Sequence, residues 1–340
     1  MRRSLLVSLL FLGCSSSPPD DVSIGAAGAA AIEPRILGGT PSDDTQNAVV
    51  MLVVVDPTTS RRLGVCTAAM VAPNLALTAR HCVSKSDGES IACDADGSAL
   101  FGGQIQSDYS PEQIFVFTGK DRPALVDDDP LDLTKWSPAG QGAEIISDRA
   151  PNLCNHDLAL VRLRAPIANN PIAAVRLDGG ARANEKLTTV GWGVTREAPQ
   201  PGQRQTRTGV NVKRVGPSSA IPVLTSSEFL FDESICLGDS GGPIFDAASG
   251  AIVGVVSRGG NGETPTDTDY AKTCVNADNL GTSLSSFKPL VNDAFARAGA
   301  TARLEAVEED SGCNGSGRRP GAGALLLAGV VAMLSRRRRG

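Results

Sequence analysis

Histidine is scarce in this sequence: only His81 and His156 occur among 340 residues, so any chemistry that needs an imidazole has two candidates. No two of the eight cysteines are spaced as Cys-x-x-Cys, which leaves a zinc site almost without support. We expect no metal and no other cofactor. Positive charge is also sparse, because eight of the 32 Lys and Arg lie in residues 1–13 and 313–340, where no acid occurs. The stretch between has 24 basic against 37 acidic residues, a charge of −13, which disfavours nucleic acid as a partner.

The remaining composition is that of a folded, turn-rich protein. Apolar residues make up 41% and charged residues 20%, which excludes global disorder. Glycine (37) and proline (21) are too frequent for a helical bundle. From Ile36 onward, short β-branched runs recur between turn signals, and their spacing predicts two barrel-like halves. Ser84–Glu112 is expected to be a long surface loop. One helix is predicted around 287–298, where apolar residues share a face and Gly299 follows as a stop.

The N-terminus predicts export. Residues 1–13 contain two arginines and then an apolar run, the pattern of a secretory signal peptide. Cys14, which follows a glycine and precedes three serines, resembles the cleavage site of bacterial lipoproteins, where the signal is cut before the cysteine and the thiol is acylated. An ordinary signal peptide cut nearby is the alternative. Residues 14–35 are mostly small and predict a flexible pro-segment.

The C-terminal residues 313–340 carry a second export pattern. Pro320–Ser335 is an apolar run of 16 residues, shorter than the ~20 of a spanning helix, and four arginines follow it. Together with Cys313 and a Gly-rich spacer, it resembles the myxobacterial-type C-terminal sorting tail, which is cut near its cysteine for display at the cell surface. A plain membrane anchor is the alternative. Either pattern predicts a protein of the cell envelope or cell surface, or one released extracellularly. The acidic, polar residues 300–312 predict a linker.

Export makes the other cysteines interpretable. Without Cys14 and Cys313, six cysteines remain. An even number in an exported domain implies three disulfides.

The strongest chemical signal is Gly-Asp-Ser-Gly-Gly-Pro, which begins at Gly238 and is centred on Ser240. A serine on a tight turn of small residues can present its hydroxyl while nearby backbone N–H groups face a common point, as acyl transfer requires. The motif also fits the α/β-hydrolase elbow, in which the histidine follows the serine. No histidine follows Ser240, so that fold is excluded.

A histidine-first order remains. His81 ends the run Leu-Thr-Ala-Arg-His, directly before a cysteine, and Asp157 immediately precedes a strand-like run. His156, beside Asp157, lacks the Thr-Ala-x-His-Cys context and is interpreted as a surface residue. His, Asp and Ser in this order are typical of chymotrypsin-type proteases.

Further motifs agree with that order. Arg35 precedes Ile-Leu-Gly-Gly, Gly191 begins Gly-Trp-Gly, and Ser257 begins Ser-Arg-Gly. Residues 36–299 thereby resemble the trypsin/chymotrypsin-like serine protease family. The resemblance implies an all-β fold of two antiparallel six-stranded β-barrels (chymotrypsin-like) with a C-terminal helix.

The resemblance also implies catalytic roles. Ser240 would be the nucleophile, and His81 the general base that later protonates the leaving amine. Asp157 would orient the imidazole, with Ser257 hydrogen-bonded to it. The N–H groups of Gly238 and Ser240 would form the oxyanion hole.

Activation and cross-links follow from the same resemblance. A zymogen would be cut between Arg35 and Ile36 by an activating protease, and the new Ile36 ammonium would pair with Asp239. Two cysteine pairs match family disulfides, Cys66–Cys82 beside the histidine and Cys236–Cys274 at the pocket wall. Cys93–Cys154 follows only by elimination.

Departures from the family concern specificity. Ser234 matches the base of the primary pocket, and because it is not an acid, a strong Lys/Arg preference is not implied. Gly259 and Gly281 would leave the pocket open for a medium or large apolar side chain. Arg258 stands where an aromatic residue is usual and would favour acidic substrates, unless it faces solvent or pairs with a loop acid. Arg80 replaces the usual small residue before the histidine.

These features predict a secreted or surface-displayed serine endopeptidase (EC 3.4.21), with protein or peptide substrates and a membrane attachment through lipid or the C-terminal tail. The alternative is a catalytically inactive homologue that serves as a surface binding module. The presence of all three triad residues favours the enzyme.

Overall fold

The structure is a computed structural model, which describes residues 37–87, 90–123, 130–132, 134–195, 198 and 201–306. The predicted signal peptide, pro-segment and sorting tail, with Cys14, Arg35, Ile36 and Cys313, lie outside the described residues. The chain divides after Glu305, and every element named below belongs to the unit that ends there. Within the described part, no helix is long and apolar enough to cross a membrane.

The first half is a closed antiparallel barrel with strand order β10-β11-β4-β3-β2-β9. Its strands are β2 (Val49–Asp56), β3 (Arg61–Ala72), β4 (Leu75–Thr78), β9 (Ile114–Phe117), β10 (Gly140–Ile146) and β11 (Ala159–Leu163). Strand β2 shows why the barrel forms, because successive side chains point to opposite faces of a strand. Val50 and Leu52 belong to the apolar core of this barrel, whereas Val49 and Met51 pack with Val190 and Trp192 of the second half.

The second half is also a closed antiparallel barrel, in the order β13-β12-β15-β16-β17-β14, with β14 pairing back onto β13. Its strands are β12 (Lys186–Gly191), β13 (Gln205–Val215), β14 (Glu228–Phe231), β15 (Pro243–Asp246), β16 (Ile252–Gly260) and β17 (Asp278–Ser283), and β1 (Thr40–Pro41) adds to β13. Phe229 and Phe231 fill its core. The fold class expected from the sequence is therefore confirmed: two closed six-stranded antiparallel barrels, with strands predominating.

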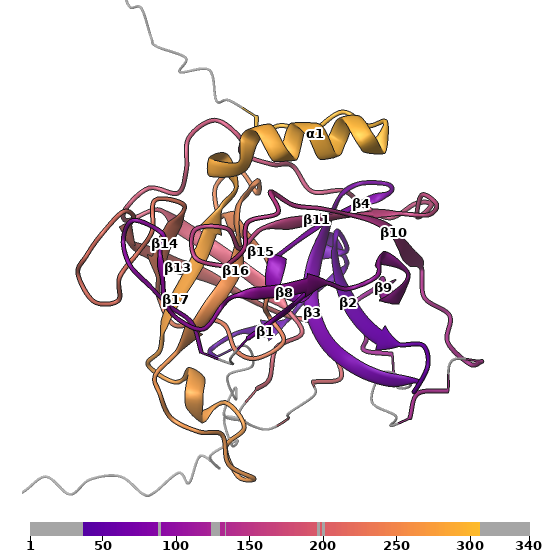
Figure 1. The fold of residues 1–340 in the computed structure, drawn as a ribbon, viewed down its shortest axis with the longest axis horizontal. Coiled ribbons are helices and arrows are strands. Elements are labelled where there is room, and N and C mark those ends of the chain that lie inside the picture. Colours follow the sequence, from indigo (N-terminus) through magenta and orange to yellow (C-terminus); the bar gives the residue numbers. More distant parts are fainter. Residues whose placement is uncertain are drawn as a thin grey trace, which may run out of the picture. The chain divides into compact units, whose positions relative to one another are not determined.

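The C-terminal helix α1 (Lys288–Ala298) lies against β4 and β11 of the first barrel (Figure 1). Its buried residues Val291, Ala294 and Phe295 join the core of that barrel. Gly299 ends the helix with φ 63°, a left-handed conformation that glycine adopts at little cost.

The predicted loop at 84–112 contains short elements. Two small antiparallel sheets form there, β5 (Ser84–Ser86) with β8 (Ile105–Asp108), and β6 (Ala92–Cys93) with β7 (Ala99–Phe101). Single 3₁₀ turns complete the described elements at η1 (Asp44–Gln46), η2 (Arg80–Cys82), η3 (Pro111–Gln113), η5 (Lys272–Cys274) and η6 (Leu284–Phe287).

Candidate active site

Both barrels contribute to one hydrogen-bonded chain. His81 lies in η2, directly after β4 of the first barrel. Its Nδ1 lies 2.9 Å from Asp157 Oδ2, and its backbone N–H donates to Asp157 Oδ1 over 2.9 Å. The Ser257 hydroxyl, on β16 of the second barrel, donates to Asp157 Oδ2 over 2.6 Å. Three residues singled out from the sequence thus meet around one carboxylate.

Burial and contact together set the proton affinities of this pair. Burial disfavours the charged imidazole, but the charge and hydrogen bond of Asp157 outweigh it and hold the pKa of His81 above its ordinary 6.5. Burial likewise opposes the charge on Asp157, yet His81 and the Ser257 hydroxyl keep the pKa of Asp157 below its ordinary 3.8. At neutral pH the carboxylate is therefore ionised, which favours a donor at Nδ1 and leaves Nε2 as the proton acceptor.

The η2 turn is braced by Arg80, which the sequence showed only as a departure from the family. This side chain is buried, and its guanidinium contacts Asp108 Oδ1 at 2.9 Å and Ser84 Oγ at 3.0 Å. Both partners belong to the β5–β8 sheet. The small sheet after the histidine therefore supports the turn that presents it.

Ser240 lies on the turn that leads into β15, between elements of both barrels. Its carbonyl accepts from the Thr67 N–H on β3 over 2.9 Å, and the Gly241 N–H donates to Val256 on β16 over 2.8 Å. A side chain at Gly241 would collide with the Thr78 hydroxyl at the end of β4. The Ser240 turn is thus packed against the end of the strand that leads to His81. In the described structure no hydrogen bond joins the Ser240 hydroxyl to His81, whose Nε2 lies 3.7 Å from Cys82 Sγ.

The Gly-Trp-Gly motif makes room for Asp239. This carboxylate is buried and accepts from the N–H of Gly193 over 2.7 Å and of Cys236 over 2.8 Å. A side chain at Gly191 or Gly193 would collide with it, which explains both glycines. Burial raises the pKa of Asp239 to about 7, although the two N–H donors oppose this rise. The two N–H donors therefore offset only part of the cost of burying a negative charge on Asp239.

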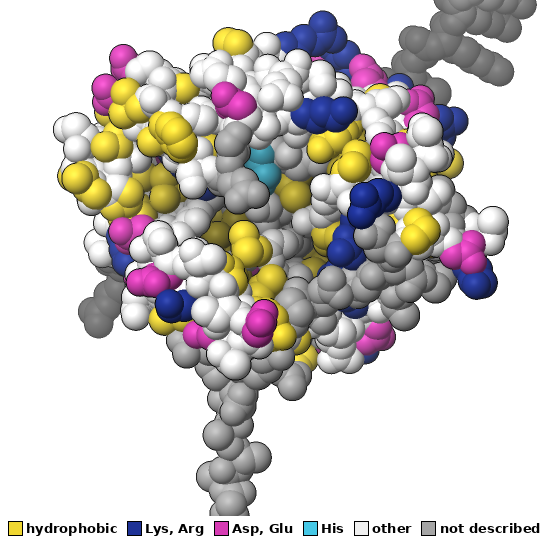
Figure 2. Space-filling view, turned by 60° about the horizontal axis from the view of Figure 1, so that its bottom comes forward, with side chains coloured by type: hydrophobic (Ala, Val, Ile, Leu, Met, Phe, Trp, Pro, Cys, Tyr) yellow, Lys and Arg dark blue, Asp and Glu magenta, His cyan; other side chains and the backbone are white. Residues whose placement is uncertain are grey.

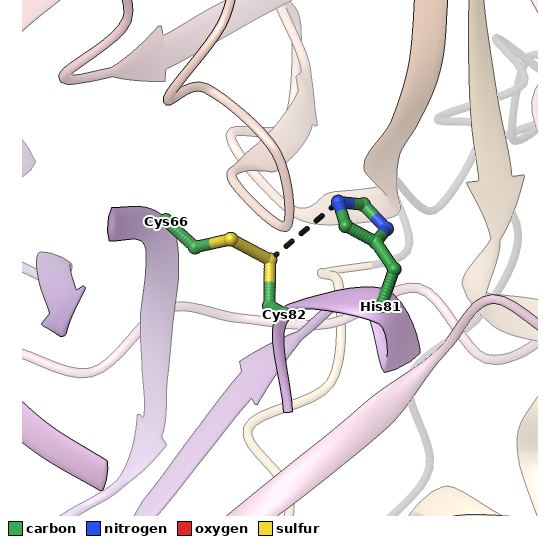
Figure 3. A group of neighbouring side chains, drawn as sticks. All are labelled: Cys66, His81 and Cys82. Carbon is green, nitrogen blue, oxygen red and sulfur yellow. Dashed lines mark hydrogen bonds between the residues drawn. A yellow bond between two sulfur atoms is a disulfide. The ribbon is translucent and has the colours of Figure 1, made fainter. Parts of the chain in front are cut away.

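Three disulfides join the predicted cysteines: Cys66–Cys82, Cys93–Cys154 and Cys236–Cys274. All three pairings expected from the sequence are confirmed. Figure 3 shows the first of them beside His81, and ligand atoms of these three residues lie within 4.8 Å of one another. Because the two sulfur atoms are bonded to each other, neither is a thiolate, and the oxidised group is not a metal-binding set.

The residues predicted for specificity have different surroundings in the structure. Ser234 is buried, and within the described structure its hydroxyl has no hydrogen-bond partner. Gly259 pairs with Asn279 across β16 and β17, and a side chain on Gly259 would collide with the Asn279 amide oxygen. Gly281 lies elsewhere: its missing side chain would point at Phe229 in the barrel core. The residue opposite Gly259 is therefore Asn279, which the sequence analysis missed. Gly281, which was expected to lie beside Gly259, faces the barrel core instead.

Arg258 pairs with an acid, but this acid belongs to strand β14 and not to a loop as the alternative had it. Its Nη1 donates to Glu228 Oε1 at the start of β14, and the Glu228 side chain is 1% exposed. The preference for acidic substrates stays a prediction. His156 lies at the surface with Nδ1 2.6 Å from Asp148 Oδ2, and Asp157 faces His81 instead.

In the space-filling view, histidine lies within a hollow bordered by hydrophobic side chains (Figure 2). Comparison with known proteins adds one finding. The family model described as Trypsin matches residues 36–278, which include the first barrel, the second barrel up to the start of β17, and all the site residues above except Gly281 and Asn279. None of the curated proteins compared with the chain matches it.

Proposed function

Because the chain belongs to the trypsin family, we propose that it is a serine endopeptidase that hydrolyses peptide bonds through an acyl-enzyme. His81 Nε2 takes the proton of Ser240 while Oγ bonds to the scissile carbonyl carbon, and then gives that proton to the leaving amine as the peptide bond breaks. A water, deprotonated in the same way, attacks the ester and releases Ser240. The observation that carries the proposal is the hydrogen-bonded chain from Ser257 through Asp157 to His81, beside the Ser240 turn.

The backbone around Ser240 supports an oxyanion hole. Within the described residues, the N–H groups of Asp239, Gly241 and Gly242 donate to backbone carbonyls, whereas those of Gly238 and Ser240 donate to none. Two free donors on either side of Asp239 suit the negative oxygen of a tetrahedral intermediate. Loss of one such donor typically raises the barrier by about 2.7–4 kcal/mol.

Activation by cleavage between Arg35 and Ile36 fits the surroundings of Asp239. Leu37 is buried and packs with Cys236 and Cys274, close in sequence to Asp239, and this packing supports an activated N-terminus at the preceding residue. The Ile36 ammonium would supply the charge that this buried carboxylate needs. The resulting pair would fix the amides of Gly238 and Ser240 in their donor geometry.

Export remains part of the proposal. Three disulfides suit an oxidising compartment, and the signal peptide, Cys14 and the tail from Cys313 would direct the protein to the cell envelope or surface. Its partners would be polypeptide substrates, an activating protease and the membrane.

Peptide hydrolysis by the matured protein tests the proposal. Protein cut after Arg35 should cleave a mixed peptide library, whereas Ser240→Ala, prepared and cut in the same way, should not. A folded, cut wild-type protein that cleaves no peptide would instead support the inactive binding module. The library also reports the residue preferred in the pocket formed around Ser234 and Gly259.

A further inference from the structure

The second barrel contains a buried ion pair next to the catalytic chain. Arg258 directly follows Ser257 on β16 and is 19% exposed, whereas its partner Glu228 is 1% exposed. One oxygen of Glu228 accepts from Arg258 Nη1, and the other accepts from the Thr225 N–H over 2.8 Å. The carboxylate is thus fully engaged and fixed in place, and the arginine is the more exposed member of the pair.

Arg258 directly follows Ser257, whose hydroxyl donates to the carboxylate that faces His81. Its positive charge lowers the pKa of His81, against the larger opposite influence of Asp157. Arg80, which precedes His81 on the same turn, is paired with Asp108. The charged groups that act on the imidazole are Asp157, from the segment before β11, and Arg258, from β16.

We propose that Glu228 is a positioning residue for the reaction: it holds Arg258 in one place and offsets its charge, so that the arginine weakens His81 less than an unpaired arginine would and does not select acidic substrates. The inference rests on the proposed protease function. Without Glu228, Arg258 would act on His81 as an uncompensated charge and would be free to bind a substrate carboxylate bidentately. An unpaired Arg258 would be expected to prefer acidic substrates. Glu228, 30 residues earlier on β14, thus suppresses this preference.

The choice of variant follows from the burial of the two groups. Removing Arg258 alone would leave Glu228 buried and unpaired, which destabilises the fold, so that a loss of stability could not be separated from a change in specificity. Glu228→Gln keeps the shape and an acceptor for Thr225 while it removes the charge. The double variant Glu228→Gln/Arg258→Gln removes both charges and is the matched control.

The two histidines of the chain allow a direct test. In a Ser240→Ala background, imidazole NMR titration gives the pKa of His81, and only one other imidazole contributes signals. We expect Glu228→Gln to lower the pKa of His81 and the double variant to return it toward the starting value. This readout does not require catalysis, so it can succeed even if the protein proves not to be a protease.

Kinetics supply the second readout, on variants that carry Ser240. For peptide pairs that differ only by Glu against Gln near the scissile bond, the ratio of kcat/KM values should favour Glu at least about threefold more in Glu228→Gln than in wild type. The double variant should lose that gain. If Glu228→Gln fails to fold, Glu228→Asp withdraws the carboxylate by one methylene and should shift both readouts in the same directions. If neither the pKa of His81 nor the ratio of kcat/KM values changes in Glu228→Gln, the inference is overturned. If the pKa of His81 shifts but the wild-type protein hydrolyses no peptide, only the proposed protease function is overturned.

Discussion

Replacing Asp157 by Asn should disable the catalytic base by forcing the wrong tautomer. Asp157 Oδ1 accepts the backbone N–H of His81 and lies 3.1 Å from Nδ1, while Oδ2 lies nearer to Nδ1, at 2.9 Å, and accepts the Ser257 hydroxyl. The Asn oxygen must take the Oδ1 position, because an amide nitrogen there would meet the His81 N–H donor to donor. The Asn nitrogen then faces Nδ1 and donates to it, so the imidazole proton moves to Nε2. In that tautomer His81 cannot accept the proton of Ser240.

We expect kcat to fall by about 10⁴-fold, equivalent to about 5 kcal/mol in the barrier. The assay is hydrolysis of a chromogenic peptide by cut protein, with thermal unfolding to verify that the fold is intact. The companion variant Ser257→Ala removes a single hydrogen bond to Asp157, worth about 1.5–3 kcal/mol, and should cost much less activity. A folded Asp157→Asn enzyme within tenfold of wild type would refute the tautomer argument.

The pH profile examines the same contact. Wild-type kcat/KM should fall on the acid side as His81 becomes protonated, with an apparent pKa above 6.5, because the folded protein raises that pKa. In Ser257→Ala the pKa of Asp157 rises, since one hydrogen bond to its ionised form is lost. An apparent pKa at or below 6.5 for the fall of wild-type kcat/KM in acid would contradict the claim that Asp157 outweighs burial and Arg258 at His81.

Three further outcomes follow. His156→Ala should leave kcat/KM within about twofold of wild type, since His156 lies at the surface on Asp148; a large loss in peptide hydrolysis would move the base assignment to it. Arg35→Gln should block maturation and leave the precursor inactive in the same assay, and full activity in the uncut variant would exclude the zymogen. Arg176→Met should lower the free energy of unfolding by about 3–5 kcal/mol in urea titration, because Arg176 is 4% exposed and contacts Glu185, Asp246 and Glu305. An unchanged free energy of unfolding in that variant would contradict the view that Arg176 compensates the charges of these three carboxylates.

Much of the fold could be predicted because its signals are local. Short apolar runs between turn residues locate β2 and β4, and Gly299 ends the helix where expected. The strands at Ser84–Ser86 and Ile105–Asp108 were missed, since polar residues carry no alternation and the paired residues lie 19 to 24 positions apart in the sequence.

The catalytic residues were accessible from short motifs, whereas their supporting contacts were not. Arg80 with Asp108 and Arg258 with Glu228 join residues distant in sequence, and nothing in the neighbouring residues indicates the partner. Glu305 makes the same point. It lies in a stretch whose polarity predicted a linker, yet its carboxylate binds Arg176 over 2.7 Å.

Fluorophosphonate labelling tests the central claim most directly, because the reagent bonds only to a serine activated as a nucleophile. Protein cut after Arg35 should become labelled, and peptide mass spectrometry should locate the adduct at Ser240. Labelling should be lost in His81→Ala and retained in His156→Ala. A properly folded and cut protein that stays unlabelled, or that is labelled at another serine, would contradict the account.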